Sequence, residues 1–287
     1  MNIEVILIQG VMLGGLYALL ATGLSLVFGV MRLVNLSHGD FVVLSAYMAL
    51  LIAQGAAVPL WMAFAVVLPL MMALGYALQR GLFNRLLDGD PMRPLLATFG
   101  LSIIVQNALM LGFSADTQLL PSGDLAFEAI DFAGASIGVL PLLTFAVAVA
   151  VITALNWVLY RTRLGRNLRA ASDDPAILDA FGVSHKHMFA IASAMAFATM
   201  CIAGVLMAMR SNFDPFIGPG RLLIAFEIVI IGGLGSFWGM FWGGILLGLA
   251  QVIGAAIDPG LQFLAGHLVF FVMLMIRPKG LFPKVDH

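Results

Sequence analysis

Apolar runs long enough to cross a membrane follow one another along almost the whole sequence. A transmembrane helix needs roughly 17–25 mostly apolar residues, because the hydrocarbon core of a bilayer is about 30 Å thick. The chain is 62% hydrophobic and only 10% charged, whereas soluble domains are about one quarter charged. We therefore predict an all-α polytopic membrane protein, with one transmembrane domain over residues 1–287 and about nine spans, in a range of eight to ten.

Two of the nine runs, Phe41–Ile52 and Leu222–Leu234, are short, which predicts broken or re-entrant helices. Such helices occur only where protein covers their free backbone groups. No basic segment or clear cleavage site marks the first run, so we expect a retained span and not a signal peptide. The predicted spans are Val5–Val30, Phe41–Ile52, Leu60–Gln79, Leu95–Phe113, Leu140–Leu159, Met188–Met209, Leu222–Leu234, Phe237–Ile257 and Leu261–Ile276.

Several functional classes leave no trace in the sequence. No phosphate-binding loop of the form GxxxxGK[ST] is present, so transport driven by ATP would need its ATPase on another chain. No basic run indicates nucleic-acid binding. Cys201 is the single cysteine, which argues against a disulfide or a cysteine-rich metal site within the chain. No Ser/His/Asp or paired-carboxylate arrangement indicates an enzyme. We expect no cofactor, metal or catalytic residue in this chain.

The distribution of Lys and Arg predicts the orientation, because cytoplasmic loops are enriched in both. With nine spans and an outer N-terminus, all but Arg210 and Arg221 of the 14 basic residues fall on the cytoplasmic side. Those residues are Arg32, Arg80, Arg85, Arg93, Arg161, Arg163, Arg166, Arg169, Lys186, Arg277, Lys279 and Lys284. Residues 114–138 carry acidic side chains but no Lys or Arg, as an outer segment should. The C-terminus is then cytoplasmic.

The most charged segment of the chain, residues 161–187, lies between two apolar runs. Asp174 and Pro175 form the pair expected at a helix start, because the Asp oxygen accepts an unpaired N–H and Pro lacks the donor that would be wasted there. Gly182 suits the left-handed position just past a helix end. We predict a short helix, Pro175–Phe181, that presents Ile177, Leu178 and Phe181 beside Asp179. The charged residues of the whole segment 161–187 are Arg161, Arg163, Arg166, Arg169, Asp173, Asp174, Asp179 and Lys186.

Two interpretations of this segment remain open. It is either a positively charged loop that lies on the lipid headgroups, or a docking element for a partner on the cytoplasmic side. The apolar face of the short helix favours the second, since that face needs cover.

Small residues recur at four-residue intervals in two places. Gly10 and Gly14 share one helix face, and Gly235, Gly239 and Gly243 share another. This spacing lets helix backbones approach closely in lipid. Ordinary bundle packing is the first interpretation, and helices that slide during transport are the second.

Polar residues interrupt the apolar pattern at two further points. Asn35, His38 and Asp40 are expected to cap a helix that starts at Phe41, with Gly39 permitting the bend. A gate or substrate path is the alternative. Glu227 lies in a short apolar run, where a carboxylate is costly unless it pairs or faces a cavity. We expect a structural partner such as Arg221 or Arg210, or a place on the substrate path.

Five segments of the chain resemble one known family in its order. They are GGLYALLATGLSLVFGVMRLVNLSHGDFVVLSAY (14–47), RTRLGRNLRAASDDPAILDAFGV (161–183), IAGVL (202–206), GGLGSFWGMFWGGILLGL (232–249) and RPKGLF (277–282). The chain resembles the LivH-type permease subunits of bacterial ATP-binding-cassette importers for branched-chain and other hydrophobic amino acids. Relatives of this family also carry urea, amides, and aromatic or dicarboxylic acids.

This resemblance implies a type II-like importer fold in the bacterial inner membrane. It also implies partners: a second, LivM-like permease subunit, two ATP-binding subunits that hold ATP and Mg²⁺, a periplasmic solute-binding protein, and membrane lipid. The short helix then looks like the coupling helix that seats in an ATPase groove. The residues expected to serve coupling are Arg163, Gly165, Arg169, Ala170, Asp174, Pro175, Phe181 and Gly182. A secondary transporter or channel is the alternative from another class.

Overall fold

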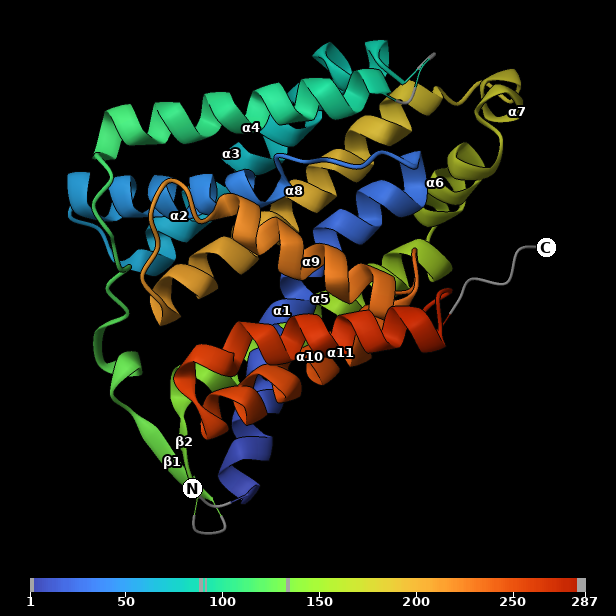
Figure 1. Ribbon diagram of the computed structural model, residues 1–287. Coiled ribbons are helices and arrows are strands. Elements are labelled where there is room, and N and C mark those ends of the chain that lie inside the picture. The colour runs from blue at the N-terminus through green and yellow to red at the C-terminus, as the bar shows by residue number, and fades with distance from the viewer. Residues whose placement is uncertain (1–2, 88–89, 91, 133–134, 283–287) are drawn as a thin grey trace.

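The computed structural model describes residues 3–87, 90, 92–132 and 135–282, and within them helices dominate (Figure 1). Each predicted apolar run is a helix. The helices are α1 (Ile3–Met31), α2 (His38–Gly55), α3 (Leu60–Gly81), α4 (Met92–Phe113), α5 (Val139–Arg161), α6 (Arg163–Asp173), α7 (Pro175–Ala180), α8 (His185–Arg210), α9 (Gly218–Gly232), α10 (Phe237–Ile257) and α11 (Gln262–Ile276). Short 3₁₀ turns cover Phe83–Arg85, Gly123–Ala126 and Pro259–Leu261. Lys284 lies outside the described residues.

Seven of the described helices are long and apolar enough to cross a membrane. They are α1, α3, α4, α5, α8, α10 and α11. The helix α9 has only 15 residues, whereas the 15 residues of α11 continue the 3₁₀ turn Pro259–Leu261 into a span of 18 residues. The helix α2 begins with His38, Gly39 and Asp40. The predicted count of nine spans is therefore not confirmed, although the polytopic helical architecture is.

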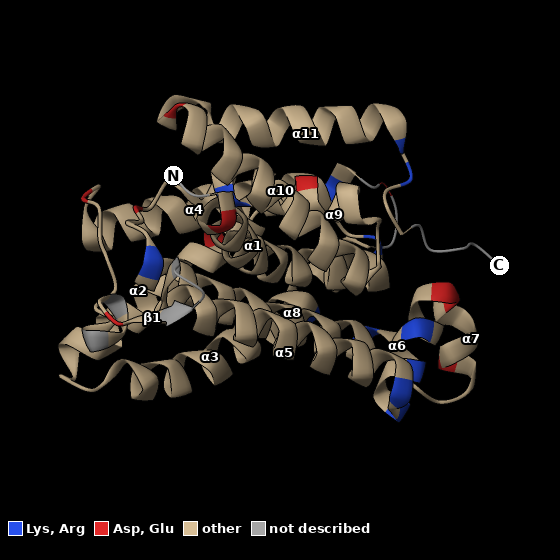
Figure 2. Ribbon diagram, turned by 90° about the horizontal axis from the view of Figure 1, so that it is seen from below, with Lys and Arg blue, Asp and Glu red and all other residues tan. Residues whose placement is uncertain are grey.

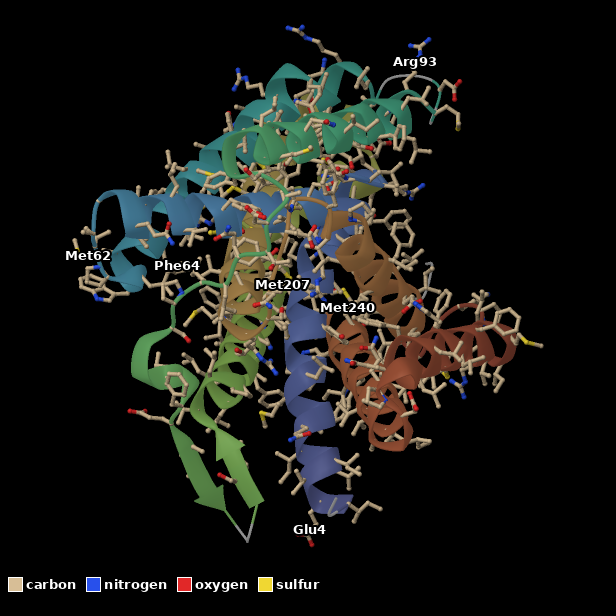
Figure 3. The ribbon with its side chains drawn as sticks, turned by 60° about the vertical axis from the view of Figure 1, so that its left-hand side comes forward. Glu4, Met62, Phe64, Arg93, Met207 and Met240 are labelled. Carbon is tan, nitrogen blue, oxygen red and sulfur yellow. The ribbon has the colours of Figure 1, made fainter. Side chains whose placement is uncertain are left out.

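The helices α1 and α8 lie at the centre of the bundle, and α3, α4 and α11 lie at its edge (Figure 1). Most of α1 and α8 is buried by protein, whereas Gly266 is the one buried residue of α11. Figure 3 shows Met207 of α8 and Met240 of α10 inside the bundle, and neither is exposed. It also shows Glu4 and Arg93 at opposite ends of the molecule.

Glycines permit the closest helix contact, between α1 and α10. A Cβ atom on Gly14 would lie 2.5 Å from the Cα atom of Ile245, and one on Gly248 would lie 2.5 Å from the carbonyl oxygen of Gly10. Real Cβ atoms do not approach backbone this closely, so larger residues would push the helices apart. Gly10 and Gly14 both lie at this contact.

The second predicted glycine stripe is only partly correct. A Cβ atom on Gly239 would lie 2.1 Å from the carbonyl oxygen of Gly232, and one on Gly243 would lie 3.0 Å from that of Ile228, so both pack α10 against α9. Gly235 was placed on the same face, and this is wrong. It lies in the turn before α10 with φ +80°, a conformation in which L-residues are strained.

The segment between α4 and α5 contains a β-hairpin, the one pair of strands among the described residues of this all-α architecture. Strands β1 (Ala129–Phe132) and β2 (Ala135–Gly138) pair antiparallel, with Ala129 opposite Gly138. Nearer α4, the segment is tied to the end of α8, since the backbones of Gln118 and Phe213 exchange hydrogen bonds of 2.8 and 2.9 Å. The hairpin leads directly into α5 and lies near the N-terminus (Figure 1).

Candidate functional sites

The short helix α7 forms as its sequence predicts. Asp174 caps it, because its Oδ1 accepts hydrogen bonds from the backbone N–H groups of Ala176 (2.9 Å) and Ile177 (3.1 Å), and Pro175 takes the first helical position. Gly182 follows the helix with φ +80°. The N–H of Gly182 donates to the carbonyl oxygen of Asp179, and the N–H of Val183 donates to that of Leu178. This pattern is the Schellman termination. The helix starts at Pro175 as predicted and ends at Ala180, one residue before the predicted Phe181.

The preceding helix, α6, was not predicted. Thr162 caps it by accepting a hydrogen bond of 3.1 Å from the N–H of Gly165. Leu168 and Ala171 are buried on one face, whereas Arg163 and Ala170 are exposed on the other. The hydroxyl of Thr162 and the i, i+3 spacing of the two buried residues were the signals available in the sequence.

Three contacts fix α6 against the membrane helices. A Cβ atom on Gly165 would lie 2.2 Å from the carbonyl oxygen of Leu159, so only glycine allows this approach to α5. The guanidinium of Arg169 donates to the same oxygen at 2.5 Å and lies 5.1 Å from the ring centroid of Tyr160. The hydroxyl of Ser172 donates to the carbonyl oxygen of Gly29 in α1 at 2.9 Å. We call residues 163–182, comprising α6, α7 and the turn that ends α7, the elbow.

The elbow exposes a small apolar surface. Ile177 is 56% exposed and Phe181, just past α7, is 81% exposed. Leu178 was expected on this surface but is only 6% exposed, because it packs inward against the bundle. Figure 2 shows Lys and Arg residues gathered around α6 and α7 at this end of the molecule.

A carboxylate and a histidine close the elbow against α8. The backbone N–H of His185 donates to Oδ1 of Asp179 at 2.9 Å, and the His185 ring lies 2.6 Å from Oδ2. The hydrogen bond from the backbone N–H, with a smaller contribution from the ring, lowers the pKa of the Asp179 carboxyl. Apart from the proximity of the two residues, nothing in the sequence indicates this pair.

The polar residues Asn35, His38 and Asp40 do not cap a helix at Phe41, so this prediction is wrong. The helix begins at His38, and its N-cap position is Ser37. Asn35 instead forms a turn, since its Oδ1 accepts from the N–H (3.0 Å) and the hydroxyl (2.6 Å) of Ser37. Gly39 lies inside the helix, where a Cβ atom would lie 1.9 Å from the carbonyl oxygen of Gly218. Close packing against α9, rather than a bend, requires glycine there.

His38 and Asp40 connect α2 to its neighbours. His38 Nε2 lies 2.9 Å from the carbonyl oxygen of Leu20 in α1, and Asp40 accepts a hydrogen bond of 2.9 Å from the side chain of Gln106 in α4. Both side chains are about 1% exposed. Within the described residues, no group of three His, Cys, Asp or Glu side chains could hold a metal ion.

Glu227 pairs with His267, which corrects the expectation of an arginine partner. Glu227 Oε1 contacts the Nδ1 atom of His267 in α11, and Oε2 is buried without a described partner. The side chain of Glu227 is 3% exposed and that of His267 is 40% exposed. A second pair joins α1 to α10, where the side chain of Gln251 accepts a hydrogen bond of 2.6 Å from the hydroxyl of Tyr17. These cross-helix pairs were missed because their members lie far apart in sequence.

These features define a multi-pass helical membrane protein with an exposed short helix, α7, at its basic end. A profile of the family described as "Branched-chain amino acid transport system / permease component" matches residues 6–277. The chain belongs to this family of membrane permeases.

Individual relatives cover nearly the whole chain. It is 32% identical to the high-affinity branched-chain amino acid transport system permease protein BraD of Pseudomonas aeruginosa, over 98% of this chain and 96% of that protein. It is 25% identical to the permease protein LivH of Escherichia coli K12, over 97% and 95% of the two chains. A probable LivH of Methanocaldococcus jannaschii is 22% identical over 97% and 92%.

One solved structure has a similar fold. It is PsaBC from Streptococcus pneumoniae in complex with Fab, with a TM-score of 0.52 and 14% sequence identity. The match covers 94% of this chain and 91% of the other chain. At this identity the likeness shows the shared fold alone.

Proposed function

We propose that the chain is the transmembrane permease subunit of an ATP-binding-cassette importer for branched-chain and related hydrophobic amino acids. The family match and the names of BraD and LivH support this substrate class over urea, amides, and aromatic or dicarboxylic acids. We also propose a type II-like arrangement with nine membrane-crossing or re-entrant helices, in which α2 and α9 are the short ones.

The observation that carries the proposal is the geometry of the elbow. A short capped helix exposes Ile177 and Phe181, while Arg169 and Ser172 hold the preceding helix to the ends of α5 and α1. A partner that binds α7 and moves would therefore displace α1, at the centre of the bundle, through the hydrogen bond of Ser172. In this role the coupling residues are those that build the elbow: Arg163, Gly165, Arg169, Ala170, Asp174, Pro175, Phe181 and Gly182.

The partner at the elbow is then an ATP-binding subunit. ATP and Mg²⁺ bind to that subunit rather than to this chain. A permease that has no differential contact with ATP can change state only through such a docked partner. Two ATP-binding subunits, a second LivM-like permease and a periplasmic solute-binding protein complete the importer. The exposed apolar surface of α11 fits either the second permease or membrane lipid.

The distribution of charge supports a periplasmic N-terminus and a cytoplasmic C-terminus. Basic residues cluster around α6, α7 and the end of α11, whereas α1 begins at the opposite end (Figure 2). Positive residues are enriched on the cytoplasmic side of membrane proteins. Labelling of single cysteines introduced at Ile3 and Phe282 in intact cells tests this orientation, which predicts that only the first reacts with an impermeant reagent.

Reconstitution tests the function itself. The chain is co-expressed with its partner permease, ATP-binding subunits and binding protein, and the purified assembly is placed in liposomes. We expect uptake of leucine, isoleucine or valine that requires both ATP and the binding protein. Uptake by this chain alone, without ATP, would instead establish a secondary transporter or channel.

A further inference from the structure

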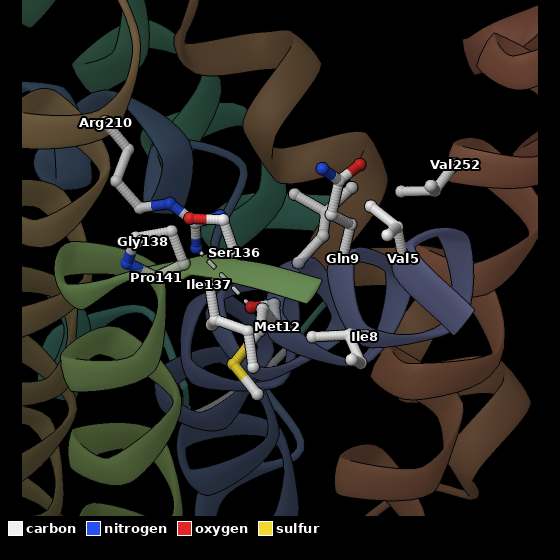
Figure 4. Close-up of a pocket in the computed structure, with 11 residues that line it drawn as sticks. Val5, Ile8, Gln9, Met12, Ser136, Ile137, Gly138, Pro141, Arg210 and Val252 are labelled. Carbon is white, nitrogen blue, oxygen red and sulfur yellow. Dashed lines mark hydrogen bonds between the residues drawn. The ribbon is translucent and has the colours of Figure 1, made fainter. Parts of the chain in front are cut away.

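A cavity of about 320 Å³ opens at the outer end of the molecule, between α1, the β-hairpin and the end of α8 (Figure 4). Most of its lining is aliphatic, with Ile8, Ile137 and Val252 among its walls. Gln9 and Ser136 contribute polar groups. Among the described residues that line the cavity, Arg210 is the one with a charge.

The guanidinium of Arg210 has few partners for its charge and its hydrogen-bond donors among the described residues. It is partly buried, and within the described part of the chain it forms no ion pair. Its one hydrogen bond is long, 3.4 Å to the carbonyl oxygen of Met12 (Figure 4). A guanidinium presents five N–H donors in a fork that matches a carboxylate. A partly buried cation with free donors favours an anionic group beside it.

We propose that this cavity is the outer reception site for the transported solute and that Arg210 binds the solute's carboxylate. The chemistry fits an α-amino acid with an aliphatic side chain. The carboxylate of the solute would pair with the guanidinium of Arg210, and its aliphatic side chain would contact Ile8, Ile137 and Val252. The carbonyl oxygen of Met12 and the amide of Gln9 are acceptors available to the ammonium group. The inference rests on the proposed import function and assigns a place to its substrate.

The size of the cavity favours a small solute over a protein segment, which would need a broad exposed surface. Inward of the cavity, α1 and α10 are in close contact. Tyr17 and Gln251 join α1 to α10 through their hydrogen bond, and glycines hold the two helices together. The solute would therefore wait here until α1 and α10 separate.

The first test measures whether the cavity attracts anions. Cys201 is fully buried, so a cysteine introduced by Ile8→Cys reports on the cavity alone. In the assembled transporter, we expect a negatively charged methanethiosulfonate to react faster than a positively charged one, relative to the same ratio at Ile3→Cys outside the cavity. Arg210→Gln should lower this preference roughly ten-fold, the scale of local charge effects on encounter rates.

Protection of the introduced cysteine identifies the occupant. Leucine, delivered by the binding protein, should slow the reaction of Ile8→Cys, and it should not do so in Arg210→Gln. If phosphatidylglycerol in the nanodisc protects the cysteine and leucine does not, a lipid headgroup occupies the site and the proposal is wrong. An equal rate for both reagents, unchanged by Arg210→Gln, also overturns it.

Transport gives the second test. Arg210→Gln should raise the KM for leucine uptake about ten-fold or more, because a charge-assisted pair to the substrate is lost. Arg221→Gln removes the same charge from a residue that does not line the cavity and should change uptake much less. Wild-type uptake by Arg210→Gln would overturn the proposal. Failure of the wild-type assembly to import any amino acid would refute the proposed function instead, and the labelling ratios would still decide whether the cavity binds anions.

Discussion

The contact between α1 and α10 and the elbow are held together by different kinds of interaction. The first depends on glycines that let two apolar backbones meet, as at Gly14 and Gly248. The second depends on side chains that bind backbone groups, as at Arg169 and Asp174. This difference predicts that changes in the first region alter stability in the membrane, whereas changes in the second alter the transmission of force between partner and bundle.

The largest effect is expected at the helix contact. Gly14→Leu places a side chain where a Cβ atom alone would lie 2.5 Å from the Cα of Ile245. We expect a loss of about 3 kcal/mol, the upper part of the range for overpacking. Thermal unfolding in detergent measures it. Gly100→Leu is the matched control, because nothing lies within 4 Å of its Cβ position, and equal behaviour of the two variants would contradict close packing.

A smaller, local effect is expected at Arg169. Arg169→Ala removes the hydrogen bond to Leu159 and the contact with the ring of Tyr160. Hydrogen bonds from charged groups contribute about 1.5–3 kcal/mol, so protection of α6 amides from hydrogen exchange should fall. Arg166→Ala removes an exposed neighbour with no side-chain bond described and should leave protection unchanged. If global unfolding shifts but α6 protection does not, Arg169 serves the bundle instead.

Loss of the α7 cap should have a still smaller effect. Asp174→Ala leaves the N–H groups of Ala176 and Ile177 without their acceptor, at a cost of about 1 kcal/mol. Hydrogen exchange over residues 175–180 should accelerate about five-fold, which corresponds to that free energy. Asp173→Ala, which alters the charge but not the cap, should behave as wild type. Equal acceleration in both variants would show that charge, not capping, stabilises α7.

The smallest effect concerns pH. The backbone N–H of His185 lowers the pKa of Asp179 in the folded protein, so the carboxylate stabilises the elbow above its unfolded pKa of about 3.9. That contribution is lost only as the pH falls through the lowered folded pKa. Protection at His185, corrected for intrinsic exchange, should stay constant from about pH 7 to 5. A fall within that window, retained in Asp179→Asn, would assign control to another group.

Local signals in the sequence predicted α7 better than they predicted the bundle. Asp174, Pro175 and Gly182 specify the ends of α7 through groups within a few residues of each other, so tertiary contacts were not needed. The same reasoning missed α6, although Thr162 offered a cap. The apolar runs predicted the helices but not which of them span the membrane.

Interactions between distant segments account for the predictions that failed. Glu227 was expected to pair with Arg221 or Arg210 but meets His267, which the chain brings close only through the packing of α11. Asp40 was expected to act on its own helix but binds Gln106 of α4. The cavity lined by Arg210 depends on the β-hairpin, whose position next to α1 has no signature in either segment alone.

The coupling role of the elbow is tested most directly by Gly182→Val in the complete reconstituted transporter. At φ +80° a branched L-residue is strained, by roughly 1–2 kcal/mol, while no atom lies within 4 Å to clash with its Cβ. The quantity to measure is leucine imported per ATP hydrolysed, beside the thermal stability of the assembly. We predict that this ratio falls several-fold at unchanged stability. Normal uptake with normal, substrate-stimulated ATP hydrolysis in the variant would contradict the coupling role.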